Sequence, residues 1–233
     1  MPRFTWCAWA LAALMSWPAL ANAQQRPALF FDLPPVGTWV EYDWQRGGKG
    51  VREYRGTFRI GVVGEATVGT TPYRWVEIRR ETKDGEKTIV QWRKLRVAVN
   101  PLKKGDPAIA GVVEGFGWGG PGTAVTKLSS LQIADFLGMG ITGSGTALTP
   151  AGAKETLKTG LGAFDARRSD LLRKGDKGTL SYYVWLTDSV PFGWAKMELR
   201  ERDEAAGSDT AFTAAAARRG EKATSEVDET KAQ

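Results

Sequence analysis

The side chains that could do acid–base chemistry in this chain are its carboxylates, because the usual nucleophilic and metal-binding partners are scarce. The sequence contains no histidine, and its single cysteine is Cys7. Ser-His-Asp catalysis needs an imidazole to accept the hydroxyl proton. Zinc, copper and haem sites of the common types need imidazole or thiolate ligands. From the sequence we therefore assign no catalytic residue, no metal site and no cofactor.

Paired carboxylates offer one remaining route to catalysis, as in glycoside hydrolysis, where two acids flank the bond that is cleaved. The first candidates are Glu41, Asp43 and Glu77. Strand alternation places these side chains on a solvent-facing surface, where a carboxylate keeps an ordinary pKa. A carboxylate-dependent hydrolase is accordingly the third of three hypotheses.

Two glycine-rich segments, 115–120 and 138–143, satisfy the pattern G-x-G-x-x-G. A dinucleotide-binding loop of this kind follows a strand and opens a helix whose N-terminus faces the pyrophosphate. Neither segment has that context, so no nucleotide is expected. The glycines between 105 and 122 instead predict a loop, with Phe116 and Trp118 as the aromatic tip of a flexible flap.

The first 23 residues have the form of a signal peptide. Arg3 precedes an apolar run, and 21–23 reads Ala-Asn-Ala, a small-x-small cleavage site before Gln24. Cleavage would remove Cys7, so no disulfide-linked partner is expected, and Gln24 stands where lipid attachment would need a cysteine. The sequence thus predicts an exported protein of the bacterial periplasm or exterior, soluble after signal cleavage.

Apolar and polar residues alternate with a period of two in most of the remaining chain, as half-buried strands require. This pattern predicts strands over 36–44, 51–63, 73–81, 88–99, 154–161, 163–172, 178–188 and 194–202. Short turns between the first four favour an antiparallel meander. Ser129 and Gln132 form a capping-box pattern for one short helix that ends near Gly138.

The expected organisation is a signal peptide at 1–23, a lead-in at 24–35, one β-rich domain at 36–202 and a mostly mobile charged tail at 203–233. The length left after cleavage suits a single core. The tail holds few large apolar side chains, chiefly Phe212 and Val227, so only a weak strand is expected around 210–216.

One segment resembles a known family. Residues 182–193 read Tyr-Tyr-Val-Trp-Leu-Thr-Asp-Ser-Val-Pro-Phe-Gly, and Lys-Met-Glu follows at 196–198. This resembles the strand, proline turn and return strand of bacterial lipoprotein-localisation proteins, the LolA/LolB-like family, and 162–167 is similar to a turn entering a strand there. The resemblance covers 162–198. It implies a mainly β (α+β) fold, an antiparallel sheet curved into an unclosed barrel with one or two short helices, whose apolar inner face can take acyl chains.

In such a half-barrel the inner face is either filled by the protein itself or binds an apolar ligand. Packing in a core is the commoner role of aromatic side chains, so both alternatives stay open. Strand alternation gives eight candidate ligand-lining residues: Tyr42, Trp44, Phe58, Ile60, Val76, Ile78, Val90 and Trp92.

Charge is unevenly distributed, with 15 Lys and Arg against 6 Asp and Glu between Arg46 and Lys104. A basic outer sheet suits an anionic membrane surface or an acidic partner, whereas export argues against nucleic acid. The first hypothesis is an exported non-enzymatic binding protein that carries or senses a lipid or a lipidated cargo such as a lipoprotein. The alternative is a structural or interaction protein of the cell envelope with a self-filled core.

Overall fold

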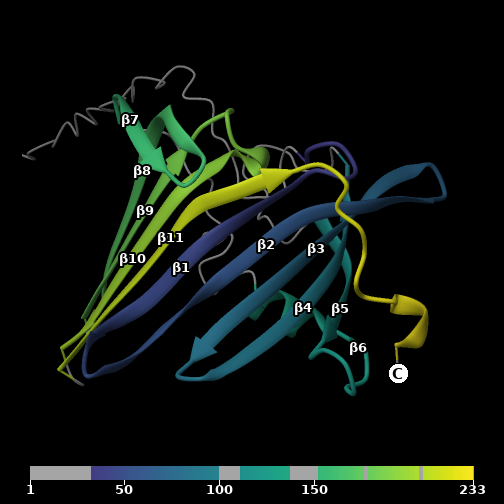
Figure 1. The fold of residues 1–233 in the computed structure, drawn as a ribbon, viewed down its shortest axis with the longest axis horizontal. Helices are drawn as coiled ribbons and strands as arrows, with labels where there is room; N and C mark the ends of the chain where they lie inside the picture. Colours follow the sequence, from purple (N-terminus) through teal and green to yellow (C-terminus); the bar gives the residue numbers. More distant parts are fainter. Residues whose placement is uncertain (1–32, 100–110, 137–151, 176–177, 205–206, 233) are drawn as a thin grey trace, which may run out of the picture.

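The computed structural model describes residues 33–99, 111–136, 152–175, 178–204 and 207–232, which form one antiparallel sheet of eleven strands (Figure 1). The predicted signal peptide and Gly138 lie outside these residues, as does most of the lead-in. The strands are β1 (Trp39–Lys49), β2 (Val51–Val68), β3 (Thr71–Asp84), β4 (Lys87–Ala98), β5 (Val112–Trp118), β6 (Thr126–Lys127), β7 (Lys154–Thr159), β8 (Gly162–Gly175), β9 (Gly178–Leu186), β10 (Trp194–Asp203) and β11 (Ser208–Gly220). The described helical segments are α1 (Ser130–Phe136), η3 (Pro191–Gly193) and η4 (Glu229–Lys231).

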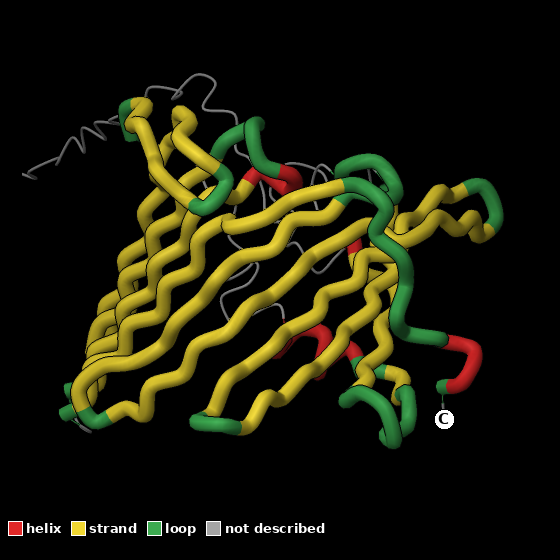
Figure 2. The backbone as a smooth tube through the Cα atoms, viewed as in Figure 1, coloured by secondary structure: helices red, strands yellow, loops and turns green. Residues whose placement is uncertain are grey.

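The strands follow the order β6-β5-β4-β3-β2-β1-β11-β10-β9-β8-β7 across the sheet. Two meanders, β1 to β6 and β7 to β11, are therefore joined in the middle by the pairing of the first strand with the last. Within the described residues β6 and β7 form the two edges and do not pair with each other, so the curved sheet stays unclosed (Figure 2). The predicted mainly β fold with an unclosed antiparallel sheet is confirmed.

The C-terminal segment differs from the mostly mobile tail that the sequence predicts. β11 is 13 residues long and pairs with both β1 and β10. Its small residues Ala214 and Ala216 lie opposite Trp44 and Tyr42 in the ladder. Small residues beside large rings fill the space between two strands well. The strand therefore forms although it carries few large apolar side chains of its own.

Within the glycine-rich stretch, residues 112–118 form the strand β5 and not the predicted loop. A Cβ atom added at Gly115 would lie 3.0 Å from Cδ1 of Ile133 in α1, so glycine here leaves room for the helix. On the opposite side of β5, Phe116 is buried and the Trp118 ring lies 4.5 Å from the ring of Trp92. Both residues of the predicted flap are thus packed in the sheet.

The short helix α1 forms where its capping pattern predicts it. The backbone N–H of Ser129 donates to Oε1 of Gln132 at 2.8 Å, and the N–H of Gln132 donates to Oγ of Ser129 at 3.2 Å. This reciprocal pair satisfies backbone donors that a helix start otherwise leaves open. Ile133 is buried whereas Leu131 is 70% exposed, so α1 packs through one side.

Side chains alternate across each strand, so the sheet has two faces. We call the face that carries Tyr42 and contacts Ile133 of α1 the inner face. The outer face carries Glu41 and Glu77 and is crossed by residues 221–232, which run in front of the sheet in Figure 1. One continuous core cluster of inner-face side chains extends from β9 to β4 and includes Val40, Tyr42, Ile60, Val76, Leu95, Val184 and Met197.

Candidate functional site

Six of the eight predicted lining residues lie together on the inner face. Tyr42 pairs with Phe58 across β1 and β2, and Ile60 pairs with Ile78 across β2 and β3. The rings of Tyr42 and Phe58 stack with centroids 4.6 Å apart. We call these six the apolar wall, and each is at most 4% exposed: Tyr42, Trp44, Phe58, Ile60, Val76 and Ile78.

The other two predicted lining residues, Val90 and Trp92, face the opposite way. In the β3–β4 ladder the residue opposite Val76 is Leu95, which belongs to the inner cluster. Trp92 is an odd number of positions from Leu95 and therefore points to the outer face, where it packs with Phe116. In β4 both the odd-numbered and the even-numbered positions hold large apolar residues, so its sequence alone does not reveal which of the two sets faces inward.

Two hydrogen bonds, one buried and one partly buried, fix two rings of the apolar wall. The hydroxyl of Tyr42 donates to the carbonyl oxygen of Trp194 at 3.1 Å, and burial raises the pKa of Tyr42, so the group stays protonated. Nε1 of Trp44 donates to the carbonyl oxygen of Glu81 in β3 at 3.2 Å. A Cβ atom at Gly56 of β2 would lie 3.1 Å from this nitrogen. Glycine thus lets the indole lie across β2.

An arginine adjoins the apolar wall. Arg80 lies opposite Phe58 in the β2–β3 ladder, and its guanidinium carbon is 4.8 Å from the ring centroid of Trp44. Burial, with repulsion from Arg46, lowers the pKa of Arg80. Burial also lowers the pKa of Arg93 on β4, whose Nη1 donates to the carbonyl oxygen of Trp92 at 2.8 Å. Neither cation is among the predicted lining residues, although Arg80 shares the parity of Ile78.

The outer face carries its own apolar patch, and the chain covers it. We call residues 221–232 the strap. The carboxylate of Glu77 accepts backbone N–H groups of Glu226 at 3.0 Å and Val227 at 3.1 Å, and the hydroxyl of Ser225 at 2.9 Å. Nζ of Lys94 donates to the carbonyl oxygen of Val227 at 3.0 Å. Val227 itself is buried with Trp92, Phe116 and Val125.

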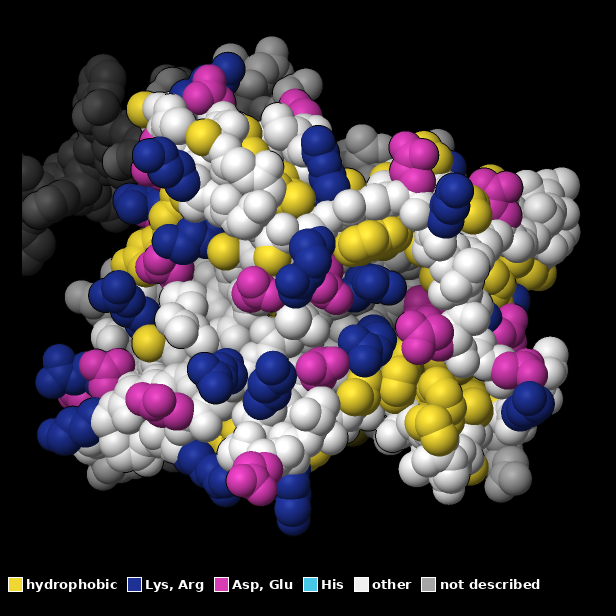
Figure 3. Space-filling view, viewed as in Figure 1, with side chains coloured by type: hydrophobic (Ala, Val, Ile, Leu, Met, Phe, Trp, Pro, Cys, Tyr) yellow, Lys and Arg dark blue, Asp and Glu magenta, His cyan; other side chains and the backbone are white. Residues whose placement is uncertain are grey.

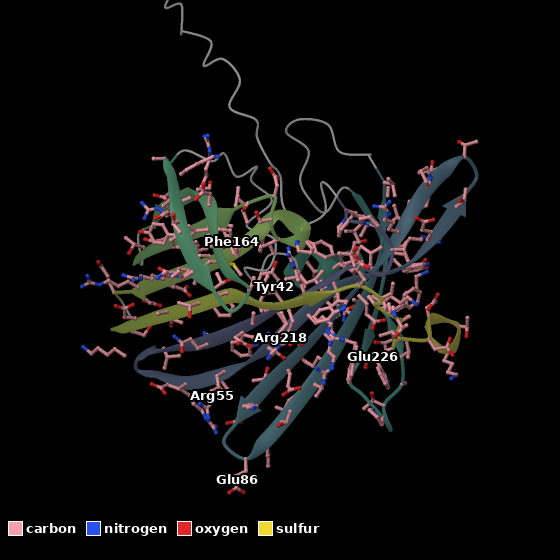
Figure 4. All side chains as sticks on the ribbon, turned by 45° about the horizontal axis from the view of Figure 1, so that its top comes forward. Tyr42, Arg55, Glu86, Phe164, Arg218 and Glu226 are labelled. Atoms are coloured by element: carbon pink, nitrogen blue, oxygen red, sulfur yellow. The ribbon has the colours of Figure 1, made fainter. Side chains whose placement is uncertain are left out.

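The anchoring of the strap affects the titration of Glu77. Burial raises the pKa of Glu77, and its hydrogen bonds from Glu226, Val227 and Ser225 oppose that shift in part. Glu226, which adds a like charge, extends from the strap in Figure 4. The environment of this carboxylate is therefore built by the strap.

The other two carboxylates of the hydrolase hypothesis are held by an arginine. Arg218 contacts Oε1 of Glu41 at 2.5 Å and Oδ1 of Asp43 at 3.0 Å, and it lies centrally among the side chains in Figure 4. These contacts raise the pKa of Arg218. All three candidate carboxylates therefore have partners within the protein. Arg218 contacts Glu41 and Asp43, and Glu77 accepts hydrogen bonds from the strap.

A polar hollow of about 820 Å³ lies over β1, β2, β10 and β11. Charges of both signs line it, and some form pairs, as Lys196 does with Glu198 at 2.7 Å. Figure 3 shows Lys and Arg side chains interspersed with Asp and Glu over this side of the molecule. Its lining includes Asp43, Thr57, Glu81, Lys196, Glu198, Thr213, Ala215 and Arg218.

Two chemical features are lacking in the part of the chain that the structure describes. No group of three or more His, Cys, Asp or Glu side chains there could hold a metal ion. Of the helices in the same residues, none has both the length and the hydropathy to cross a membrane.

The chain is similar to several solved structures at low sequence identity. A Bacteroides fragilis protein with a YmcC-like fold aligns with 10% identity and a TM-score of 0.35, covering 82% of this chain and 99% of that one. A LolA superfamily protein from Nitrosomonas europaea aligns with 8% identity and a TM-score of 0.31, covering 87% and 92%. A β-barrel-like protein of a domain of unknown function from Brucella abortus aligns with 8% identity and a TM-score of 0.25, covering 82% and 99%.

Comparisons of sequence give no match. No family model matches this chain, and no curated protein does. Identities of 8 to 10% identify no ligand, so the inner face must be interpreted from its own residues.

Proposed function

We propose that this chain is an exported, non-enzymatic binding protein that carries or senses a lipid or a lipidated cargo on the inner face of its half-barrel. The observation that supports it is the apolar wall across β1, β2 and β3 in a sheet that stays unclosed. The predicted signal peptide supports export. A lipoprotein, whose acyl chains would lie on the wall, is one cargo of this class.

Burial of acyl chains supplies the driving force for this function. Each buried methylene group contributes about 0.8 kcal/mol, so a chain lying along the wall gains several such increments. The ligand would displace side chains of the same core cluster, and Ile133 of α1 is one member of that cluster. A seven-residue helix is marginal on its own, so the position of α1 depends on packing such as that of Ile133.

Tryptophan quenching by a brominated fatty acid tests the proposal, because bromine quenches only rings that it contacts. Delipidated protein titrated with bromoundecanoic acid should lose emission from Trp44, which lies in the apolar wall. Trp44→Phe should remove most of this quenching. The matched control is Trp92→Phe, since Trp92 lies on the outer face and should not report on ligand.

The alternative function is a structural or interaction protein of the envelope whose core is filled by its own side chains. The low exposure of the apolar wall favours this candidate. It predicts no quenching by the fatty acid and a protein partner captured by crosslinking. An absence of quenching in a sample with a native circular dichroism spectrum would overturn the lipid proposal.

A further inference from the structure

Arg80 and Arg46 on the inner face differ from Arg79 and Arg218 on the outer face in how their charge is compensated. On the outer face Arg79 pairs with Glu81 at 3.2 Å, and Arg218 pairs with Glu41 at 2.5 Å. On the inner face, within the described residues, neither Arg80 nor Arg46 forms an ion pair with a carboxylate. The difference appears between neighbouring residues of one strand, Arg79 and Arg80.

The position of Arg80 makes this lack of a counter-charge costly. Its side chain is half-buried beside Trp44 and Phe58, and the positive charge of Arg46 acts on it. Removing a charge from water without a partner is unfavourable, and a second cation adds repulsion. An anion placed between these guanidinium groups would reduce both the cost of burying the charge and the repulsion between the two cations.

We infer that Arg80, with Arg46, binds the anionic head group of an amphiphile whose hydrocarbon chain lies along the apolar wall. This inference rests on the proposed function and narrows its ligand class. The head group is a carboxylate or a phosphate, since a guanidinium presents N–H donors that match either group in pairs. The guanidinium carbon of Arg80 lies over the ring of Trp44, and a cation–π contact of this kind does not use the N–H donors.

The placement along the strands suits such a ligand. The chain reverses beyond Arg46 and Arg80 at the turns joining β1 to β2 and β3 to β4, so both arginines lie toward that end of the sheet. Tyr42, Ile60 and Val76 lie farther from those turns. An amphiphile would therefore bind with its head group toward these hairpins and its chain directed away from them.

A comparison of charged and neutral ligands tests the inference. Quenching titrations would use bromoundecanoic acid and its methyl ester on wild type, Arg80→Gln and Arg79→Gln. Wild type should bind the acid at least about tenfold more tightly than the ester, the factor that one charge-assisted hydrogen bond supplies. Arg80→Gln should lose this preference, whereas Arg79→Gln, changed at the adjacent outer-face position, should keep it.

The outcomes separate this inference from the proposed function. If neither ligand quenches Trp44, the lipid-binding proposal itself is wrong. If wild type binds acid and ester equally, or if Arg79→Gln and Arg80→Gln lose the preference alike, apolar binding stands and the head-group site is overturned. Competition between inorganic phosphate and the fatty acid distinguishes a site for a free anion from a site for the head group of an amphiphile. Phosphate that competes as strongly as the fatty acid would indicate a free-anion site and overturn the amphiphile.

Discussion

The two faces of this sheet are made by the same strands, yet they differ in what completes them. On the outer face the apolar patch around Trp92 is covered by Val227 of the strap, and Arg79 has a carboxylate partner. On the inner face the apolar wall adjoins Arg80, which lacks such a partner among the described residues. An apolar patch therefore does not mark a binding site by itself. Both apolar surfaces are buried, so the informative difference is whether the charge beside them has a partner.

The largest effect is expected on the inner face. Phe58→Ala should lower the free energy of unfolding by about 3–5 kcal/mol, because it removes a buried aromatic ring that stacks on Tyr42 and leaves a cavity. Urea unfolding followed by circular dichroism measures this. Ile89→Ala is the control, since Ile89 is 49% exposed and should change the stability by less than about 0.5 kcal/mol. A loss below about 1 kcal/mol for Phe58→Ala would mean that the wall is not packed as a core.

Removal of the strap should have a smaller effect and should leave the inner face intact. Deletion of residues 221–233 exposes Trp92 and Phe116 and removes the partners of Glu77 and Lys94. The lost burial and hydrogen bonds predict destabilisation of about 2 kcal/mol, with a red shift of tryptophan emission.

Quenching of Trp44 by bromoundecanoic acid provides the control for this deletion. If the strap serves only the outer face, the deleted protein should bind the acid as wild type does. A large change in affinity would show that the two faces are coupled and would break the comparison between them. Thr224→Ala, which changes an exposed strap residue, should alter neither stability nor binding.

The sequence predicts the strands better than the faces. Period-two alternation identifies β1 to β4 and β7 to β10, and the Ser129–Gln132 pattern identifies α1, because these signals are local. β11 is predicted only as a weak strand around 210–216, because Ala214 and Ala216 take their stability from large partners on β1. The side of β4 that faces inward depends on its register with β3, which no local pattern contains.

The candidate site was predictable in part for the same reason. Six residues of the apolar wall follow from alternation in β1, β2 and β3. The contribution of Gly56, which lets Trp44 reach β3, depends on a contact across three strands. Whether Arg80 has a carboxylate partner among the described residues depends on which side chains the fold brings near it. Neither property can be read from neighbouring residues in the sequence.

Loss of an ion pair on the outer face should lower the free energy of unfolding less than loss of buried apolar contacts on either face. Arg218→Ala should lower the free energy of unfolding by about 1 kcal/mol or less, because Arg218 is largely exposed although its partner Glu41 is buried. Unfolding in low and high salt measures the effect. The difference between wild type and variant should shrink as salt rises, and a difference insensitive to salt would point to lost packing instead.

The smallest effect concerns the carboxylate that anchors the strap. Glu77→Gln keeps the length and shape of the side chain and removes its ionisation, so comparison with wild type isolates the titration of Glu77. Burial raises the pKa of Glu77 in the folded chain above its ordinary value of 4.5, so the folded state holds the proton more tightly than the unfolded state. Tighter proton binding by the folded state stabilises it. That stabilisation is fully present below the unfolded pKa and is lost as pH rises through the folded pKa. Wild type should therefore lose stability relative to Glu77→Gln as pH rises from about 4 to 7, as urea unfolding of both proteins can measure. A constant difference over that range would show that folding leaves the ionisation of Glu77 unchanged and would contradict a strap contact that responds to pH.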